Sequence, residues 1–384
     1  MDATDMFLTD EQKMLRDMVR DFAESEVKPI AAEIDEEERF PEENIAKMAE
    51  LGLLGVCYDE KYGGAGMDNL SYIIAVEELS RVCASTGITL AAHISLGLGP
   101  ISLFGTDEQK EKYMPPLCSG EYLGAFGLTE PNAGSDAGGT ETTAVLDGDE
   151  WVINGTKIYC TNGSVAGTTV ITAVTDKTMG TKGISSFIVP TDNPGYIRGK
   201  KERKLGIKAS DTSMIHFEDL RIPKENILGT PGEGFKQFLI TLDGGRISIG
   251  AMALGIAQGA MEEAVRYSQE RYQFNKPIAA FQSIQNKLAD MATEIEAARH
   301  LVYHAARLKD LGKPYSRQSA MAKLFASEVS TRVANQAIQV HGGYGYVKEY
   351  PVERMFRDAK ITEIGEGTSE IQRLVIARSL LDKK

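Results

Sequence analysis

The sequence contains few cysteines, and their spacing excludes several kinds of site. The 384 residues include four cysteines, no two of which form a CxxC pair: Cys57, Cys83, Cys118 and Cys160. Neither a zinc site nor a dithiol redox motif is therefore indicated. Cysteines this sparse do not build a disulfide framework, so we expect free thiols, a reducing compartment and a cytoplasmic protein.

Common catalytic signatures are also missing. The sequence has no GxGxxG, GxSxG or HExxH motif, which disfavours a Rossmann dinucleotide site, a serine hydrolase and a zinc peptidase. Glu296, His300 and His304 share one predicted helix face but lack a further ligand nearby. We interpret them as a solvated or interfacial helix face and expect no metal.

Length and charge exclude further classes. The first residues, MDATDMFLTDEQKML, lack the basic and apolar regions of a secretory signal. No apolar run approaches the length of a membrane span, so we expect no association with a membrane. The net charge of −13 disfavours a nucleic-acid partner, because phosphate backbones attract basic surfaces.

The chain divides into three zones by periodicity. Residues 1–120 are helical, with capping boxes at Thr9-x-x-Gln12 and Thr106-x-x-Gln109. Residues 121–231 carry short β-branched runs with no helices between them, and residues 232–384 return to long apolar-periodic helices. We therefore predict an α+β fold with a helical N-terminal domain (1–120), a central antiparallel β-barrel-like domain (121–231) and a C-terminal helix bundle (232–384).

Some segments give sharper structural predictions. Leu70 to Val82 has the composition of a buried helix. Asn154-Gly155, inside EWVINGTKIYCT, predicts a two-residue hairpin turn. Long helices are predicted over residues 235–272, 283–311 and 316–340.

One carboxylate near the C-terminal end stands out. In the run DAKITEIGEGTSEIQR, Glu366 lies between Gly365 and Gly367. A helix start follows, where Thr368 and Ser369 can cap and Ser369-x-x-Gln372 fits a capping box. Because neither neighbour has a side chain, both the carboxylate and the backbone N–H of this bend can come close to a bound molecule. That pairing suits proton abstraction next to a carbonyl. A solvated glutamate in a flexible loop is the alternative.

Other segments are ambiguous when each is taken alone. FGLTEPNAGSDA (126–137) either offers N–H groups and hydroxyls to a polar ligand or is only a linker. Gly342 in QVHGGYGY either caps a helix or lets the backbone approach a cofactor. Arg271 in RYQFNKP either satisfies helix-end carbonyls or holds a phosphate. Asp243 and Arg246 lie one helical turn apart and predict a local ion pair.

Together these segments resemble one family. FGLTEPNAGSDA, KIYCTNG, LDGGR, RYQFNKP, FQSIQ, QVHGGYGY and EGTSEIQR follow one another in this order and are similar to motifs of the acyl-CoA dehydrogenases, most of all the short-chain, butyryl-CoA-type members. The resemblance implies a helical N-terminal domain, a central β domain, a C-terminal four-helix bundle, FAD as cofactor and a homotetramer.

The resemblance also implies roles for individual residues. Glu366 would be the catalytic base. The flavin ring and pyrophosphate would contact Phe126, Leu128, Thr129, Gly134, Ser135, Tyr159, Cys160 and Thr161. The FAD of a neighbouring subunit would be held by Arg271, Phe274, Gln282, Gln339, Gly342, Gly343, Thr368 and Glu370. Acyl-CoA would lie along Ser135, Asp243, Arg246, Gly365 and Gly367.

The implied reaction is the FAD-dependent α,β-dehydrogenation of a short-chain acyl-CoA to the trans-2-enoyl-CoA, with electrons passed to an electron-transfer flavoprotein. Glu366 would take the α-proton while the β-hydrogen leaves as hydride. The reverse reaction, as an enoyl-CoA reductase in an electron-bifurcating complex, and a non-enzymatic acyl-CoA-binding protein are the alternatives.

One departure from the family pattern bears on the substrate, and one comparison within the family bears on the base. Many relatives have Tyr where this chain has Gly365, and losing that ring predicts a wider pocket that accepts a branched or cyclic acyl group. Isovaleryl-type relatives take their base from the LDxxR helix, but here that helix offers Gly244 and Gly245. We therefore expect the base to be Glu366.

Overall fold

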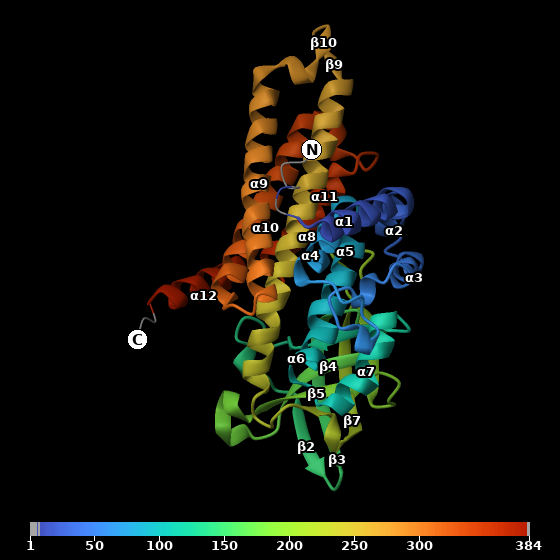
Figure 1. Ribbon diagram of the computed structural model, residues 1–384, viewed down its shortest axis with the longest axis vertical. Coiled ribbons are helices and arrows are strands. Elements are labelled where there is room, and N and C mark those ends of the chain that lie inside the picture. Colours follow the sequence, from blue (N-terminus) through green and yellow to red (C-terminus); the bar gives the residue numbers. More distant parts are fainter. Residues whose placement is uncertain (1–5, 7, 382–384) are drawn as a thin grey trace.

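The computed structural model describes Met6 and residues 8–381, and its elements fall into three parts (Figure 1). A sheet-rich part forms one end of the long axis, a group of mostly short helices packs beside the middle, and long helices run nearly the full length. The α+β fold predicted from the sequence is confirmed. The outer limits predicted for the first and last domains, residues 1 and 384, lie outside the described residues.

The N-terminal helices surround one buried helix. Every residue of the predicted segment Leu70 to Val82 is buried, because α4 is covered by α1 and α5 on one side and by a C-terminal helix on the other. Both predicted capping boxes form, at Thr9 and at Thr106. The helices are α1 (Asp10–Phe22), α2 (Lys28–Glu36), α3 (Glu42–Glu50), α4 (Asn69–Val82), α5 (Ala84–Ala92), α6 (Gly99–Phe104) and α7 (Asp107–Ser119).

The central part is one eight-stranded sheet in the order β6-β7-β3-β2-β4-β5-β8, with β1 paired to β4. The sheet folds back on itself, since the Tyr196 hydroxyl of β6 lies 3.0 Å from Thr169 Oγ1 of β4 although three strands separate them in the sheet order. The strands are β1 (Leu123–Gly127), β2 (Thr143–Asp147), β3 (Glu150–Thr161), β4 (Ala166–Val174), β5 (Ile184–Pro190), β6 (Tyr196–Lys201), β7 (Thr212–Pro223) and β8 (Ile227–Leu228).

Two expectations for this part are wrong in detail. The sheet is not purely antiparallel, because β1 pairs with β4 in parallel; the long chain between them supplies the crossover that a parallel pair needs. Asn154-Gly155 makes no hairpin: β3 runs straight through it with a shift in register, and Gly155 at φ 150 fits against Thr142 with no room for a β-carbon. The turn lies between β2 and β3 instead, at Gly148.

The C-terminal part is the predicted helix bundle. The long helices α8 (Gly234–Glu270), α9 (Gln282–Asp310) and α10 (Ser316–His341) run side by side along the long axis of the molecule (Figure 1). A small hairpin, β9 (Tyr272–Gln273) with β10 (Lys276–Pro277), joins α8 to α9 at the far tip. The shorter α11 (Val352–Ala359) packs on α8 and α10, and α12 (Ser369–Leu381) packs on α10.

Two segments contradict the expectation that no apolar run approaches the length of a membrane span. The residues from Ala84 to Phe104 and the helix α8 are each long and apolar enough to cross a membrane by length and composition. The apolar windows are 72% and 78% buried inside the protein, which is typical of core helices rather than of membrane spans.

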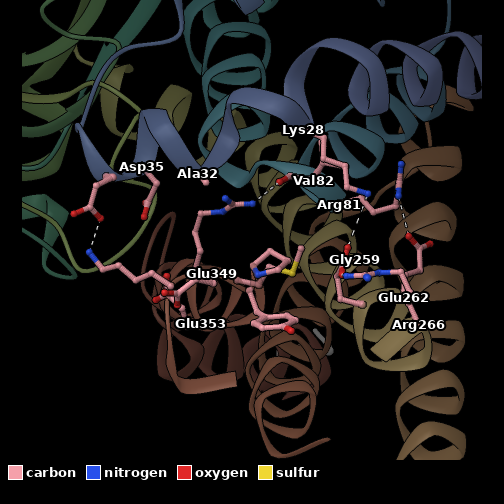
Figure 2. A pocket seen from close by; sticks show the side chains of 17 residues that line it. Lys28, Ala32, Asp35, Arg81, Val82, Gly259, Glu262, Arg266, Glu349 and Glu353 are labelled. Atoms are coloured by element: carbon pink, nitrogen blue, oxygen red, sulfur yellow. Dashed lines mark hydrogen bonds and ion pairs between the residues drawn. The ribbon is translucent and has the colours of Figure 1, made fainter. Parts of the chain in front are cut away.

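The N-terminal and C-terminal helices also meet across a charged cavity of about 290 Å³ (Figure 2). Arg81 reaches from α4 toward Glu262 on α8, at 2.8 Å. Arg357 of α11 binds Asp35 of α2 at 2.6 Å. The cavity contains none of the predicted site residues. The first pair joins α4 to α8, and the second joins α11, which precedes the segment with Glu366, to α2.

Candidate active site

Glu366 lies on the short bend between the 3₁₀ turn η11 (Lys360–Glu363) and α12. Its backbone has φ 54, and Gly367 follows with φ 99. Two consecutive left-handed residues turn the chain inward, so the glutamate side chain points into the protein and not into solvent. The residue is half-buried, but its Oε2 atom is shielded from solvent and has no hydrogen-bond partner among the residues that the structure describes.

The carboxylate of Glu366 lies against helix α8 at Gly245. A β-carbon built on Gly245 would be 1.8 Å from Oε2 of Glu366, so only glycine leaves space for the acid at this point. The LDGGR segment of α8 therefore carries no acidic side chain where isovaleryl-type relatives have their base. Its Gly245 instead leaves room for the carboxylate that comes from the loop.

The electrostatic environment makes Glu366 a competent base near neutral pH. Burial raises the pKa of Glu366 to about 7, and the positive charges of Lys323 and Arg246 oppose that rise. A general base works best when its pKa is close to the operating pH. Among the described residues, the backbone N–H of Glu366 donates to no acceptor. Glu366 can therefore offer a ligand both a proton acceptor, its carboxylate, and a hydrogen-bond donor, its N–H.

The predicted pair on α8 forms as expected. Arg246 donates from Nη1 to Oδ1 of Asp243 at 2.6 Å, and Ser316 at the start of α10 donates to the same oxygen at 2.9 Å. Burial raises the pKa of Asp243. Arg246 is 4% exposed, and its Nε has no partner. The pair lies beside Glu366, since Arg246 is one of the two cations that act on the base.

Two residues of this site were missed by the sequence analysis. Lys323 of α10 is fully buried and donates to the carbonyl oxygen of Gly367 at 2.7 Å. Gln372 donates from Nε2 to the carbonyl oxygens of Glu366 and Gly367, at 3.2 and 2.9 Å. No sequence motif marks Lys323. Gln372 belongs to the EGTSEIQR motif, but we predicted that its side chain would cap the helix that follows.

The capping box predicted at Ser369 and Gln372 is wrong. The N-terminal cap of α12 is Thr368, whose Oγ1 accepts the N–H of Ile371 at 3.4 Å. The Gln372 side chain is needed to hold the bend, so it cannot fold back onto the N–H of Ser369. Glu370 lies exposed in the first turn of α12, which matches the favourable position for an acid at a helix start.

The flavin segment predicted from FGLTEPNAGSDA begins in β1 and continues as a loop. Phe126, Leu128 and Thr129 are half-buried, and Gly134 and Ser135 are exposed. A buried ion pair shapes this loop: Lys157 of β3 lies 2.6 Å from Oε1 of Glu130 and also donates to the carbonyl of Leu128 at 3.1 Å. No motif or periodicity in the sequence indicates this pair.

The KIYCTNG segment makes a bulge in β3. The register shifts between Lys157 and Cys160, and Tyr159 adopts φ 56 with 62% of the residue exposed. Cys160 points the other way, into the core of the sheet, where burial raises the pKa of its thiol to about 12. Cys160 can therefore offer a ligand only its backbone, whereas Tyr159 and the half-buried Thr161 can offer side chains.

The remaining predicted residues gather at the opposite end of the bundle. Arg271, Gly342 and Gly343 line a second cavity of about 880 Å³, and the guanidinium of Arg271 lies 5.3 Å from the ring centre of Tyr344. A β-carbon on either glycine would meet nothing within 4 Å, so a ligand can approach the backbone. Three other predicted residues of this group are exposed: Phe274, Gln282 and Gln339.

The chain does not bring these two groups together. Positions 245 and 271 are 26 residues apart on and just beyond one helix, which corresponds to roughly 39 Å at 1.5 Å per residue. Arg271 and Glu366 are therefore not parts of one compact site within a single chain.

Comparison with known proteins agrees with this description. Three family models match in order: the acyl-CoA dehydrogenase N-terminal domain (residues 9–121), middle domain (125–220) and C-terminal domain (232–381). The short-chain specific acyl-CoA dehydrogenase of Clostridium acetobutylicum is 58% identical, over 97% of this chain and 98% of its own length.

Solved structures are equally similar. Butyryl-CoA dehydrogenase from Megasphaera elsdenii has a TM-score of 0.96 at 50% identity, over 97% of this chain and 99% of that chain. A chain from work on the electron transferring flavoprotein of Acidaminococcus fermentans and flavin-based electron bifurcation has a TM-score of 0.97 at 54% identity, over 98% and 99%. Acyl-CoA dehydrogenase complexed with FAD from Bacillus anthracis has a TM-score of 0.92 at 38% identity, over 98% and 68%.

The three-part fold and the sealed acid describe a class of enzyme that removes a proton from a bound acyl group. The chain belongs to the acyl-CoA dehydrogenase family, whose members act on the CH–CH bond of acyl-CoA. It is therefore an enzyme rather than the non-enzymatic acyl-CoA-binding protein considered as an alternative.

Proposed function

We propose that this protein catalyses the FAD-dependent α,β-dehydrogenation of a short-chain acyl-CoA to the trans-2-enoyl-CoA, with Glu366 as the base. One observation carries this proposal: Oε2 of Glu366 is shielded from solvent and has no hydrogen-bond partner among the described residues, and the pKa of this carboxyl is about 7. The backbone N–H of the same residue is free to donate to a ligand. The similarity to short-chain and butyryl-CoA dehydrogenases supports the chain length.

The chain contributes two functions at the reacting carbons. Glu366 accepts the α-proton through Oε2, while its backbone N–H donates to the thioester carbonyl and stabilises the negative charge that develops there. Gln372 and Lys323 bind the backbone of the bend. These contacts fix the position of the Glu366 carboxylate relative to the backbone N–H of the same residue. Arg246 and Lys323 favour the ionised form of Glu366 before the reaction begins.

FAD fits the open surfaces of the chain. Phe126 to Thr129 and the Tyr159 bulge flank one site, and the exposed Gly134 has no atom within 4 Å of the position of a β-carbon. When bound, FAD supplies the hydride acceptor for the β-hydrogen. The relative from Bacillus anthracis that is complexed with FAD supports this cofactor.

A homotetramer accounts for the second group of residues. Arg271 and the glycines after α10 lie too far from Glu366 to share its cofactor, and the hairpin that carries Phe274 projects with that residue 87% exposed. We infer that these residues hold the FAD of a neighbouring subunit. An assembly of subunits would then be required for cofactor binding and not only for stability.

We infer further that electrons pass to an electron-transfer flavoprotein, which the relative from Acidaminococcus fermentans supports. That same relative comes from work on bifurcation, so the reverse reaction, enoyl-CoA reduction, is the second candidate. Anaerobic titration of the bound flavin with saturated and unsaturated CoA esters distinguishes the two directions. We also propose a cytoplasmic location, which the four free thiols favour.

Gly365 is the proposed source of a broader acyl specificity. A β-carbon there would meet only Ile361, at 3.5 Å or more, so the place where relatives carry a ring is open. We therefore propose that branched or cyclic short acyl groups are accepted. Turnover that falls for every substrate bulkier than butyryl-CoA would count against this, and Gly365→Tyr should restrict the enzyme to straight chains.

The proposed reaction is tested by Glu366→Gln. The variant should bind FAD and acyl-CoA normally but lose flavin bleaching by butyryl-CoA by about 10²- to 10⁴-fold, the usual contribution of a general base. Glu363→Gln, one turn earlier and bound to Thr331, is the matched control and should keep most of the bleaching rate. Unchanged bleaching in Glu366→Gln would place the base elsewhere.

A further inference from the structure

Lys323 is an unusual residue in this fold because it is a fully buried cation, and no carboxylate of the described residues lies at ion-pair distance from it. It is 0% exposed, and among the described residues its ammonium has a single hydrogen-bond acceptor, the carbonyl oxygen of Gly367 at 2.7 Å. Burying a charge without a direct counter-ion is costly. That cost is expected to be offset by a function of the charge itself.

Lys323 begins a polar row on α10 that faces the catalytic bend. Ser327, one turn further, donates to the carbonyl of Thr362 at 2.7 Å, and Thr331, another turn on, donates to Glu363 at 2.5 Å. Residues four apart lie on the same helix face. The row therefore binds the segment from Thr362 to Gly367 at three successive points, and Lys323 holds the end nearest the acid.

We propose that Lys323 is a positioning residue for the dehydrogenation: it anchors the bend through Gly367, and its positive charge favours the ionised form of Glu366 that accepts the proton. This inference rests on the proposed function of Glu366. It goes beyond that function because it assigns the fixed geometry and the charge state of the base to a residue that touches neither the substrate nor the cofactor.

The surrounding charges are consistent with this role. Lys323 faces Glu366, Arg246 of α8, Glu363 of η11 and Glu370 of α12, while Glu366 faces Arg246 and Tyr72 of α4 as well. Burial lowers the pKa of Lys323 to about 8, and Glu366 opposes that change. Lys323 is thus mostly protonated at neutral pH, where its charge acts on the carboxylate.

Two substitutions separate the anchor from the charge. Lys323→Gln removes the charge and keeps a donor for Gly367, whereas Lys323→Met removes both. In purified, FAD-loaded enzyme, the rate of flavin bleaching by butyryl-CoA is measured between about pH 5 and pH 9. In both variants, the pH at which the bleaching rate reaches half its maximum on the acidic side (the midpoint) should rise by about one unit or more, which is the usual effect of losing a nearby opposite charge. Only Lys323→Met should also lower the plateau rate at high pH.

The matched control is Lys287→Met, which removes a lysine of α9 that bonds to α10 at Gln336, away from the bend. It should leave the midpoint in place. Midpoints of both Lys323 variants within about 0.2 units of the wild type would overturn the charge role. If Lys323→Met fails to fold, Lys323→Gln decides alone. A wild-type enzyme that no acyl-CoA bleaches would refute the proposed function instead.

Discussion

The Oε2 atom of Glu366 lies so close to Gly245 that a β-carbon on that glycine would be 1.8 Å from it. The acid comes from a loop near the end of the chain and the glycine from the middle of a buried helix. A glycine inside a helix normally costs about 1 kcal/mol relative to alanine. Its presence in α8 is explained by the space that the base requires.

The contact with Gly245 predicts that Gly245→Ala inactivates the enzyme without unfolding it. The new methyl group must displace the carboxylate, and a displacement of about 1 Å at a reacting group costs on the order of 10²-fold in rate. FAD content and thermal melting should be close to wild type. Gly244→Ala is the control, because its β-carbon would meet only the flexible end of Lys309 at 3.3 Å. Equal bleaching rates in the two variants would contradict the assignment.

The raised pKa of Glu366 predicts a pH-dependent effect of Glu366→Gln on stability. The folded-state pKa of about 7 exceeds the ordinary value of 4.5, so the folded protein binds this proton more tightly than the unfolded chain. The free energy of unfolding therefore falls as pH rises from about 4.5 to about 7, by at most ~3 kcal/mol from this group. Glutamine does not ionise and avoids that loss.

The expected measurement is a pair of denaturant titrations. Glu366→Gln should be more stable than the wild type at about pH 8 and nearly equal to it at about pH 4, where the glutamate is mostly neutral in both the folded and the unfolded protein. A stability difference that is the same at both pH values would show that the glutamate is not held in a desolvated site. Glu370→Gln, exposed on α12, should not gain stability at alkaline pH, because hydrogen bonds at the helix start lower the pKa of Glu370 instead of raising it.

The sequence was sufficient for most of the fold and to single out Glu366 as the candidate base, because both depend on local patterns. Long apolar periodicity marked α8, α9 and α10 to within about two residues, and the capping boxes at Thr9 and Thr106 formed as written. The hairpin at Asn154 failed because packing against Thr142 decided the conformation of Gly155. Turn propensity was overridden by a tertiary contact.

The sequence did not reveal the buried residues that hold the bend of Glu366 in place. Lys323 lies 43 positions before Glu366 in the chain, and its contact with Gly367 depends on how α10 packs against the bend. The same holds for Glu130 and Lys157, which meet only because β3 pairs beside the loop that follows β1. Charges that are buried by long-range packing leave no periodic or motif signal.

The second group of residues predicts that Arg271→Ala weakens FAD binding without changing the chemistry of the base. Its guanidinium lies over Tyr344 beside the open glycines after α10, where it can hold a phosphate. The dissociation constant of FAD should rise at least tenfold, whereas flavin bleaching at saturating FAD should be nearly normal. Lys313→Ala, exposed at the other end of α9, is the control. An unchanged dissociation constant would remove Arg271 from the cofactor site.

The buried pair in the β domain predicts that Lys157→Met disorders the loop that flanks the flavin. Lys157 and Glu130 are 0% and 3% exposed, and Glu130 also accepts the N–H groups of Glu141 and Thr142. Removing the lysine leaves a buried carboxylate without its counter-ion, which typically costs about 3–5 kcal/mol. Lys224→Met, at an exposed pair with Asp149, should change the stability little, because solvent screens exposed ion pairs. Denaturant midpoints together with FAD retention measure both effects, and a Lys157→Met protein as stable and as yellow as the Lys224→Met protein would show that the ion pair does not shape the loop.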